Sequence, residues 1–255
     1  MKTKKMSVWL SENGEAISNA SKSSMLAYLN NNMRPLQDGV YIGKIQNDGW
    51  GTTSGDDYAN IGSYMRCEPW QTTSIGITTA DAAAIVIQHG GYRLGIALTE
   101  PSNPLSWGSS QSAVGYATTS DSNTFDGVTR TARVMASDAF KNDDANTYAV
   151  SYCYNYMVKN TNSSSRTEQI GKHHWWLPTM GDLSLIHQHF ETINLALQRI
   201  KNAGIQSVDL LQRTQYWSCC EYSAGGAWIL DFSNGNRYNY NKVDTKDRVR
   251  PVTAF

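Results

Sequence analysis

The C-terminal stretch of residues 215–255 constrains the fold of this chain most. It reads QYWSCCEYSAGGAWILDFSNGNRYNYNKVDTKDRVRPVTAF, and Trp217, Trp228 and Phe232 recur in it among small and polar residues. The Ser-Asn-Gly-Asn run at 233–236 separates two strand-like runs, and its Asn-Gly pair supplies the positive φ angles that a tight hairpin needs. We therefore interpret this stretch as strands in which apolar anchors alternate with positions that are free to change.

Four short motifs follow one another in the second half of the chain. They are Trp176-Leu177-Pro178, Tyr216-Trp217-Ser218-Cys219-Cys220-Glu221, Ala227-Trp228 and Val249-Arg250-Pro251-Val252. Their order resembles that in the variable proteins of diversity-generating retroelements, and in the wider bacterial lectin-like family, over roughly residues 116–255. The resemblance implies an α+β, C-type lectin-like fold with two main helices and a C-terminal antiparallel sheet.

Local composition and the resemblance together divide the chain into three portions. Residues 1–38 are expected to be an N-terminal extension that packs on another element or mediates assembly, with a short helix in residues 21–36. Residues 39–115 are expected to be β-rich, either as a small subdomain or as the opening strands of the main domain. Residues 116–255 would then be the lectin-like domain, with a variable region at about 213–255.

Local patterns predict individual elements. Residues 39–45 predict a strand, and residues 82–88 and 92–99 predict a hairpin across Gly90-Gly91, because the first run is β-branched. Gly- and Ser-rich or polar stretches predict loops at 47–58, 101–123 and 160–167. Residues 126–136 resemble the segment before the first helix of the lectin-like family, and residues 145–158 are expected to form that first helix.

A longer helix is predicted after Pro178. Thr179 caps it, with Asp182 in the capping-box position three residues later. An apolar stripe follows at steps of three and four, and it consists of Leu183, Ile186, Phe190, Ile193, Leu197 and Ile200. We expect a break near His189, where relatives often split into two helices, and an end at Gly204.

Composition excludes several classes of function. The net charge is +0, charged residues are 17% of the chain and no basic block occurs, which argues against a nucleic-acid partner. The chain has no apolar run of about 18 residues and no signal-peptide core, so neither a membrane span nor export by the general secretory route is predicted. The 14 Tyr and 8 Trp against 5 Phe are typical of exposed contact surfaces.

The residues that could carry catalysis or bind metals form no recognisable site. Cys67, Cys153 and the adjacent Cys219-Cys220 make no C-x-x-C pair, so we expect reduced thiols and no zinc. His187 and His189 are two residues apart, not four, and nucleophile-elbow, phosphate-loop and calcium-lectin motifs are absent. We therefore predict no metal, no cofactor and no enzymatic activity. Formylglycine-generating enzymes share the lectin-like fold and use a cysteine pair, which leaves that reading as a distant alternative.

The resemblance also implies which positions vary. Retroelement mutagenesis acts chiefly on asparagine AAY codons, which cannot yield Lys, Glu, Gln, Met or Trp. The frame residues are Trp217, Ser218, Glu221, Ala227, Trp228, Phe232, Gly235, Lys242, Val249, Arg250 and Pro251. The variable positions are Cys219, Cys220, Tyr222, Ala224, Gly225, Gly226, Ile229, Asp231, Arg237, Tyr238, Tyr240, Val243, Asp244 and Asp247. Tyr222, Arg237, Tyr238 and Tyr240 are expected to form one outer patch.

These observations lead to one expected function and one main alternative. The expected function is non-catalytic binding of a cell-surface protein or glycan by a diversified protein on a phage tail or a bacterial surface; a homo-oligomer is left open. The alternative is a non-diversified lectin-like adhesin or carbohydrate-binding protein, because the same frame occurs without a retroelement.

Overall fold

The computed structural model describes residues 37–45, 65–71, 82–115, 125–159, 169–170, 172–204 and 207–254. The unit Gln37–Phe255 is compact and distinct from Met1–Leu36. The predicted helix in residues 21–36 and the predicted loops at 47–58 and 160–167 lie outside the described residues.

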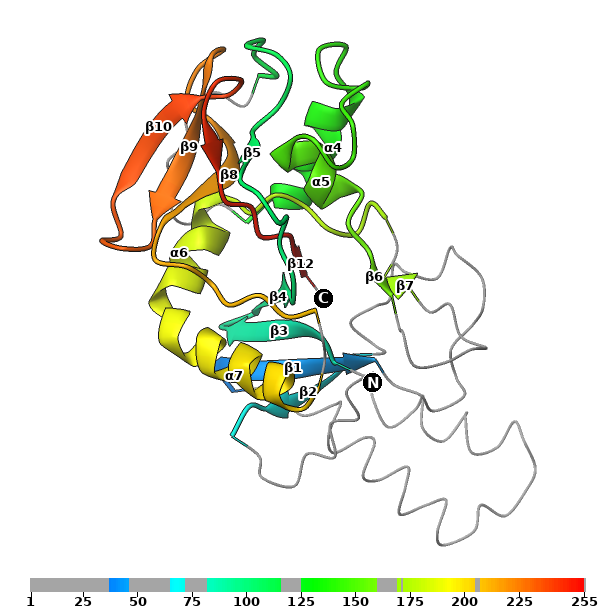
Figure 1. Cartoon of the computed structure of the whole chain (residues 1–255), viewed down its shortest axis with the longest axis vertical. Coiled ribbons are helices and arrows are strands. Elements are labelled where there is room, and N and C mark those ends of the chain that lie inside the picture. The colour runs from blue at the N-terminus through cyan, green and yellow to red at the C-terminus, as the bar shows by residue number, and fades with distance from the viewer. Residues whose placement is uncertain are drawn as a thin grey trace, which may run out of the picture. The chain divides into compact units, whose positions relative to one another are not determined.

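An antiparallel sheet with strand order β12–β4–β3–β1–β2 forms one layer of this unit (Figure 1). Its strands are β1 (Gly39–Ile45), β2 (Met65–Pro69), β3 (Ala82–His89), β4 (Tyr92–Ala97) and β12 (Val252–Ala254). The predicted hairpin is confirmed, since β3 and β4 pair across Gly90, whose φ is +55°. β12 pairs with β4, so the strands β1 to β4 and the C-terminal strand belong to one sheet of one compact unit. The strands β1 to β4 are therefore opening strands of the main unit.

The strand β3 is buried on both faces, which explains its uninterrupted apolar run. Ile85 and Ile87 belong to the large core, whereas Val86 faces a smaller cluster that includes Trp175. A strand covered on both sides reads as a continuous hydrophobic segment. The prediction that residues 82–88 form a strand and not a helix is confirmed.

A second sheet, which we call the C-terminal sheet, has the order β10–β9–β8. Its strands are β8 (Gln215–Glu221), β9 (Gly226–Asp231) and β10 (Arg237–Asn241). The predicted hairpin turn joins β9 to β10, and Gly235 in it has φ +75°. Two short pairs complete the strands of the described residues: β5 (Leu105–Ser106) with β11 (Lys246–Asp247), and β6 (Val158–Lys159) with β7 (Gln169–Ile170).

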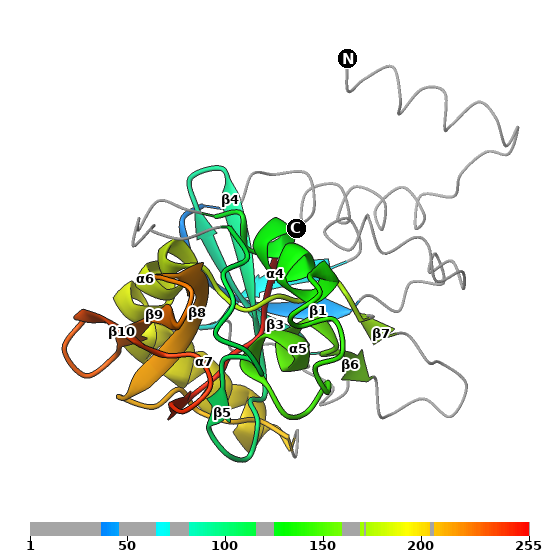
Figure 2. The same ribbon diagram turned by 90° about the horizontal axis from the view of Figure 1, so that it is seen from above.

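Two consecutive helices, α6 (Met180–Gln188) and α7 (Phe190–Asn202), pack against the two sheets. The predicted capping box is confirmed, since Thr179 Oγ1 accepts from the Asp182 amide at 3.0 Å and Asp182 accepts from the Thr179 amide at 2.9 Å. The six-residue stripe is buried throughout, and the predicted break at His189 separates the two helices. The break lets α6 contact β8 and β9 while α7 contacts β1 and β3 (Figures 1 and 2).

The expected position of the first helix was wrong. Residues 126–136, expected to precede it, form the helix α4 (Gly127–Ala136), and α5 spans only Ala149–Tyr154 of the predicted 145–158. Close packing holds the start of α4 in place, because a Cβ on Gly127 would lie 2.3 Å from Trp176 Cδ1. Together the helices and antiparallel sheets make this a mixed α+β unit.

Candidate functional site

The segments that carry the four sequence motifs meet in the folded chain. Trp176 and Val252 exchange two backbone hydrogen bonds of 2.9 and 3.0 Å, and the Trp217 amide donates to Arg248 O at 3.0 Å. The Cys219 amide donates to Pro178 O at 2.8 Å, which joins β8 to the start of α6. The frame is therefore a hydrogen-bonded assembly of segments far apart in the sequence.

A buried ion pair lies at the centre of the frame. Lys242 Nζ is 2.5 Å from Glu221 Oε1, and both side chains are at most 1% exposed. The ammonium also donates to Ser112 O at 3.1 Å and lies 4.7 Å from the centre of the Trp107 ring. Burial lowers the pKa of Lys242, while the hydrogen bond and charge of Glu221 act in the opposite direction. Buried charges of this kind persist only when they are paired and hydrogen-bonded.

The loop 105–115, which begins with the two residues of β5, closes over this ion pair, and no local sequence pattern predicts that contact. Trp217 Nε1 donates to Leu105 O at 2.9 Å, and Trp107 Nε1 donates to Ser218 O at 2.8 Å. The Val114 amide donates to the Glu221 carboxylate at 3.0 and 3.1 Å. The local sequence offers only Trp107, an isolated Trp in a stretch rich in Ser and Gly, and such a residue does not indicate which segment it contacts.

The exposed variable positions lie on and around β10. Tyr238 and Tyr240 occupy one face of that strand, opposite Ile229 and Ala227 of β9. Their rings are stacked, with centroids 6.4 Å apart and planes 9° from parallel. Tyr238 is exposed, whereas Tyr240 is half-buried and its hydroxyl accepts from Gln215 Nε2 at 3.2 Å.

The other face of the same strand carries different residues. Arg237 and Asn239 stand opposite Leu230 and Trp228, and successive side chains of a strand point to opposite faces. Tyr222 packs edge-on against Trp228, with ring centroids 5.0 Å apart. The expected single patch is therefore corrected. All four residues are at least partly exposed, but Tyr238 and Tyr240 lie on one face of β10, Arg237 lies on the other, and Tyr222 follows the end of β8.

Several variable positions are not at the surface. The exposed ones are Tyr222, Ala224, Arg237, Tyr238 and Asp244, and the half-buried ones are Gly225, Asp231, Tyr240 and Val243. The buried ones are Cys219, Cys220, Gly226, Ile229 and Asp247. This last group contradicts the expectation of solvent-facing positions. α6 covers one face of the C-terminal sheet and the loop 105–115 covers the other, while Asp247 lies on β11 opposite Leu105 of β5.

The frame residues show the opposite distribution. Nine of them are buried, namely Trp217, Ser218, Glu221, Ala227, Phe232, Lys242, Val249, Arg250 and Pro251. Trp228 and Gly235 are half-buried. The prediction that the frame supplies the core of this region is thus confirmed. Trp228 is the large frame side chain that is only half-buried.

The adjacent cysteines lie in the core between the C-terminal sheet, α4 and α6. Cys67, Cys153, Cys219 and Cys220 are free thiols. Burial raises the pKa of the Cys219 thiol well above its usual value, so this group is protonated at neutral pH, whereas the hydrogen bond with Cys219 lowers the pKa of the Cys220 thiol. The thiolate, not the thiol, is the reactive form of cysteine, so the protonated Cys219 suits packing better than nucleophilic chemistry.

Asp247 provides a test that uses pH. Burial, reinforced by the charge of Asp231, raises the pKa of Asp247 to about 6, and its Oδ2 has no hydrogen-bond partner among the described residues. The fold therefore favours the neutral acid, and this stabilisation is complete below about pH 4 and is lost as the pH rises through about 6. We expect Asp247→Asn to raise the free energy of unfolding by about 1–2 kcal/mol relative to the parent protein at about pH 7. At about pH 4 we expect almost no difference between the two proteins.

Urea unfolding at the two pH values measures this difference. Asp244→Asn is the matched control, since Asp244 is exposed and its substitution should change stability at neither pH. A gain for Asp247→Asn of the same size at both pH values would show that the carboxyl does not titrate as described. Asp182, whose pKa burial also raises to about 6, titrates identically in all three proteins.

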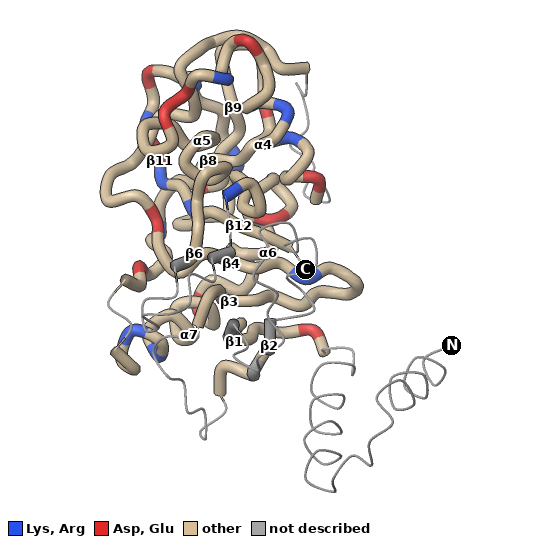
Figure 3. The backbone as a smooth tube through the Cα atoms, turned by 90° about the vertical axis from the view of Figure 1, so that its right-hand side faces the viewer, with Lys and Arg blue, Asp and Glu red and all other residues tan. Residues whose placement is uncertain are grey.

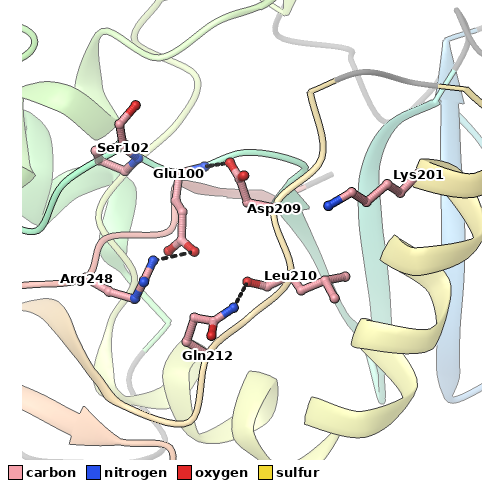
Figure 4. Close-up of a pocket in the computed structure, with 8 residues that line it drawn as sticks. Glu100, Ser102, Lys201, Asp209, Leu210, Gln212 and Arg248 are labelled. Carbon is pink, nitrogen blue, oxygen red and sulfur yellow. Dashed lines mark hydrogen bonds and ion pairs between the residues drawn. The ribbon is translucent and has the colours of Figure 1, made fainter.

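A cavity of about 350 Å³ lies away from β10, between the end of β4 and the segment before β8 (Figure 4). Figure 4 shows the Glu100 carboxylate facing the Arg248 guanidinium, and their closest atoms are 3.1 Å apart. The Glu100 amide donates to Asp209 Oδ2 at 3.1 Å, and Arg250 donates to Ala97 O and Asp209 O at 3.0 and 2.8 Å. Desolvation raises the pKa of Glu100 although both arginines oppose it. The cluster anchors the C-terminal segment to β4.

Charges of both signs are scattered over the described part of the chain (Figure 3). No helix in the described ranges has the length and apolarity needed to cross a membrane. A scan against protein-family models gives no match for this sequence, and neither does a search of curated proteins.

Proposed function

We propose that this chain is a non-catalytic binding protein with a C-type lectin-like fold, whose C-terminal region is diversified by a retroelement. One observation carries the proposal: the frame residues are almost all buried, whereas Tyr222, Arg237 and Tyr238 are exposed on the adjoining strands and loop. A surface that changes without unfolding the protein needs this separation between stability and recognition.

The exposed side chains suit recognition of a macromolecule. Tyrosine and arginine dominate binding energy at interfaces, and tyrosine offers a large contact area at a low cost in side-chain entropy. We propose a cell-surface protein or glycan as the target, with display on a phage tail or a bacterial surface. The Tyr238–Tyr240 stack and the Tyr222–Trp228 pair would supply the main contacts.

The gene neighbourhood tests the diversification directly. We expect a reverse transcriptase gene nearby, and a near-copy of the DNA for residues 215–255 that differs from the coding copy at adenines. The differences should fall in the codons of exposed positions such as Tyr222 and Tyr238, and not in those of Trp217 or Lys242. A locus with neither feature would refute diversification and leave the binding function to be tested separately.

The buried positions favour a second candidate, a non-diversified lectin-like adhesin or carbohydrate-binding protein. Cys219, Cys220 and Ile229 are at most 1% exposed, and random replacement of such residues would often disturb the core. In that case one fixed surface binds one class of ligand. A glycan array probed with the whole chain distinguishes the two, because a fixed lectin should give the same saccharide specificity in every natural copy of the protein.

A further inference from the structure

The cavity of about 350 Å³ between the end of β4 and the segment before β8 has a buried carboxyl group in its wall (Figure 4). The Glu100 side chain is only 4% exposed, and its Oε1 takes both ion pairs, with Arg248 at 3.1 Å and Arg250 at 3.5 Å. The Tyr216 hydroxyl approaches the same carboxyl group from the core. Oε2 has no hydrogen-bond partner of ordinary geometry among the described residues. A buried acceptor of this kind is unfavourable, so this oxygen suits a donor from outside the chain.

Further polar groups surround this carboxyl group. The Glu100 amide donates to Asp209 Oδ2 at 3.1 Å, which leaves Asp209 Oδ1 to a ligand. Figure 4 shows the Lys201 ammonium of α7 pointing toward Asp209, with no ion pair drawn between the two groups. The Arg248 side chain is 34% exposed, so its guanidinium can also be reached from solvent. The cavity therefore offers acceptors and charged donors side by side.

The mixture of charges indicates the class of ligand. The lining contains two carboxylates, Glu100 and Asp209, and two cations, Lys201 and Arg248, so it favours neither a strongly acidic nor a strongly basic molecule. A hydroxyl group both donates and accepts hydrogen bonds, which suits a lining with both kinds of partner. The lining also includes Pro101 and Leu210, which offer apolar surface to the C–H groups of a ring. The volume lies within the range of about 300–1,000 Å³ of small-molecule sites.

We propose that this cavity binds one saccharide unit. Hydroxyl groups of the sugar donate to Glu100 Oε2 and Asp209 Oδ1 and accept from Lys201 and Arg248. None of the variable positions lines the cavity. The site is therefore separate from the tyrosine surface of the proposed function, and it keeps one specificity when the residues of β10 change.

A titration of the whole ¹⁵N-labelled chain locates the site. The probes are the methyl glycosides of glucose, galactose, mannose and N-acetylglucosamine, each added to about 50 mM, because one sugar unit should bind with a Kd of about 1–10 mM. At least one glycoside should shift the backbone amide signals of Ser102, Asp209 and Gln212 and leave that of Tyr238 unchanged. Shifts confined to β10, or none with any glycoside, would overturn the proposal. So would shifts at these amides with glycine and with none of the glycosides, because the cavity would then be specific for a zwitterion.

Two variants on the rim of the cavity test the contacts. Lys201 is exposed, and Lys201→Ala removes a charged donor, so the affinity for the glycoside that binds best should fall about tenfold. Lys172→Ala replaces another exposed lysine and should bind like the parent protein. Asp209→Asn retains an acceptor for the Glu100 amide but loses the charge, and it should weaken binding about three- to tenfold. Parent-like affinity in both rim variants would contradict the assignment. Neither variant touches β10, so a failure here leaves the proposed function standing.

Discussion

Lys242→Met is expected to destabilise this protein by about 3–5 kcal/mol. The substitution preserves most of the side-chain volume but leaves the Glu221 carboxylate charged inside the core, with its closest cation removed. It also removes the donor to Ser112 O and the cation over the Trp107 ring. Urea unfolding followed by tryptophan fluorescence measures the loss, and exchange of the Val114 amide should report that the loop 105–115 loosens.

The double variant Lys242→Met/Glu221→Gln separates the charge from the packing. A neutral glutamine can still accept from the Val114 amide, and no unpaired charge stays buried. We expect the double variant to recover most of the lost stability, because an uncompensated charge costs more than the absence of the pair. Equal losses in the single and double variants would show that packing around Lys242, and not its charge, holds this region together.

The second large effect is expected at Trp217. Its indole is fully buried and its Nε1 donates to Leu105 O at 2.9 Å, so Trp217→Ala opens a cavity and leaves a carbonyl without its donor. The expected cost is about 3–5 kcal/mol. Trp228 is the matched control, since it is half-buried and its Nε1 is buried without a hydrogen-bond acceptor among the described residues. Trp228→Ala should cost only about 1–2 kcal/mol.

Thermal or urea unfolding of the two alanine variants checks this ranking. The sequence alone treats Trp217 and Trp228 as equal anchors, so the difference between them comes from the fold. A larger loss of unfolding free energy for Trp228→Ala than for Trp217→Ala would contradict this ranking. It would mean that the half-buried Trp228 ring contributes more to stability than its exposure indicates.

The helices after Pro178 could be predicted because their signals are local. Thr179 and Asp182 are three residues apart, and the apolar stripe repeats within one or two turns. The hairpins could be predicted for the same reason, since Gly90 and Gly235 mark turns between neighbouring strands. Structure that depends on a few adjacent residues can be predicted without knowing the distant contacts of the fold.

Other features depend on partners that are distant in the sequence. Burial on both faces of the C-terminal sheet hides Ile229 and the Cys219-Cys220 pair, although strand alternation predicts that every second residue faces solvent. The helix α4 was missed because Val128, Thr129 and Thr131 are β-branched and Asp126 makes no side-chain cap. Tertiary packing overrides such weak local preferences.

The central claim is that the buried frame carries stability and leaves the exposed positions free for recognition. Two codon-randomised libraries test it: one at the exposed positions Tyr222, Ala224, Arg237, Tyr238 and Asp244, the other at the buried frame positions Trp217, Ser218, Glu221, Phe232 and Lys242. The decisive measurement is the fraction of clones in each library that unfold cooperatively within about 5 °C of the parent protein. We predict that most clones of the exposed library and few of the buried library pass. Equal fractions in the two libraries would contradict the account.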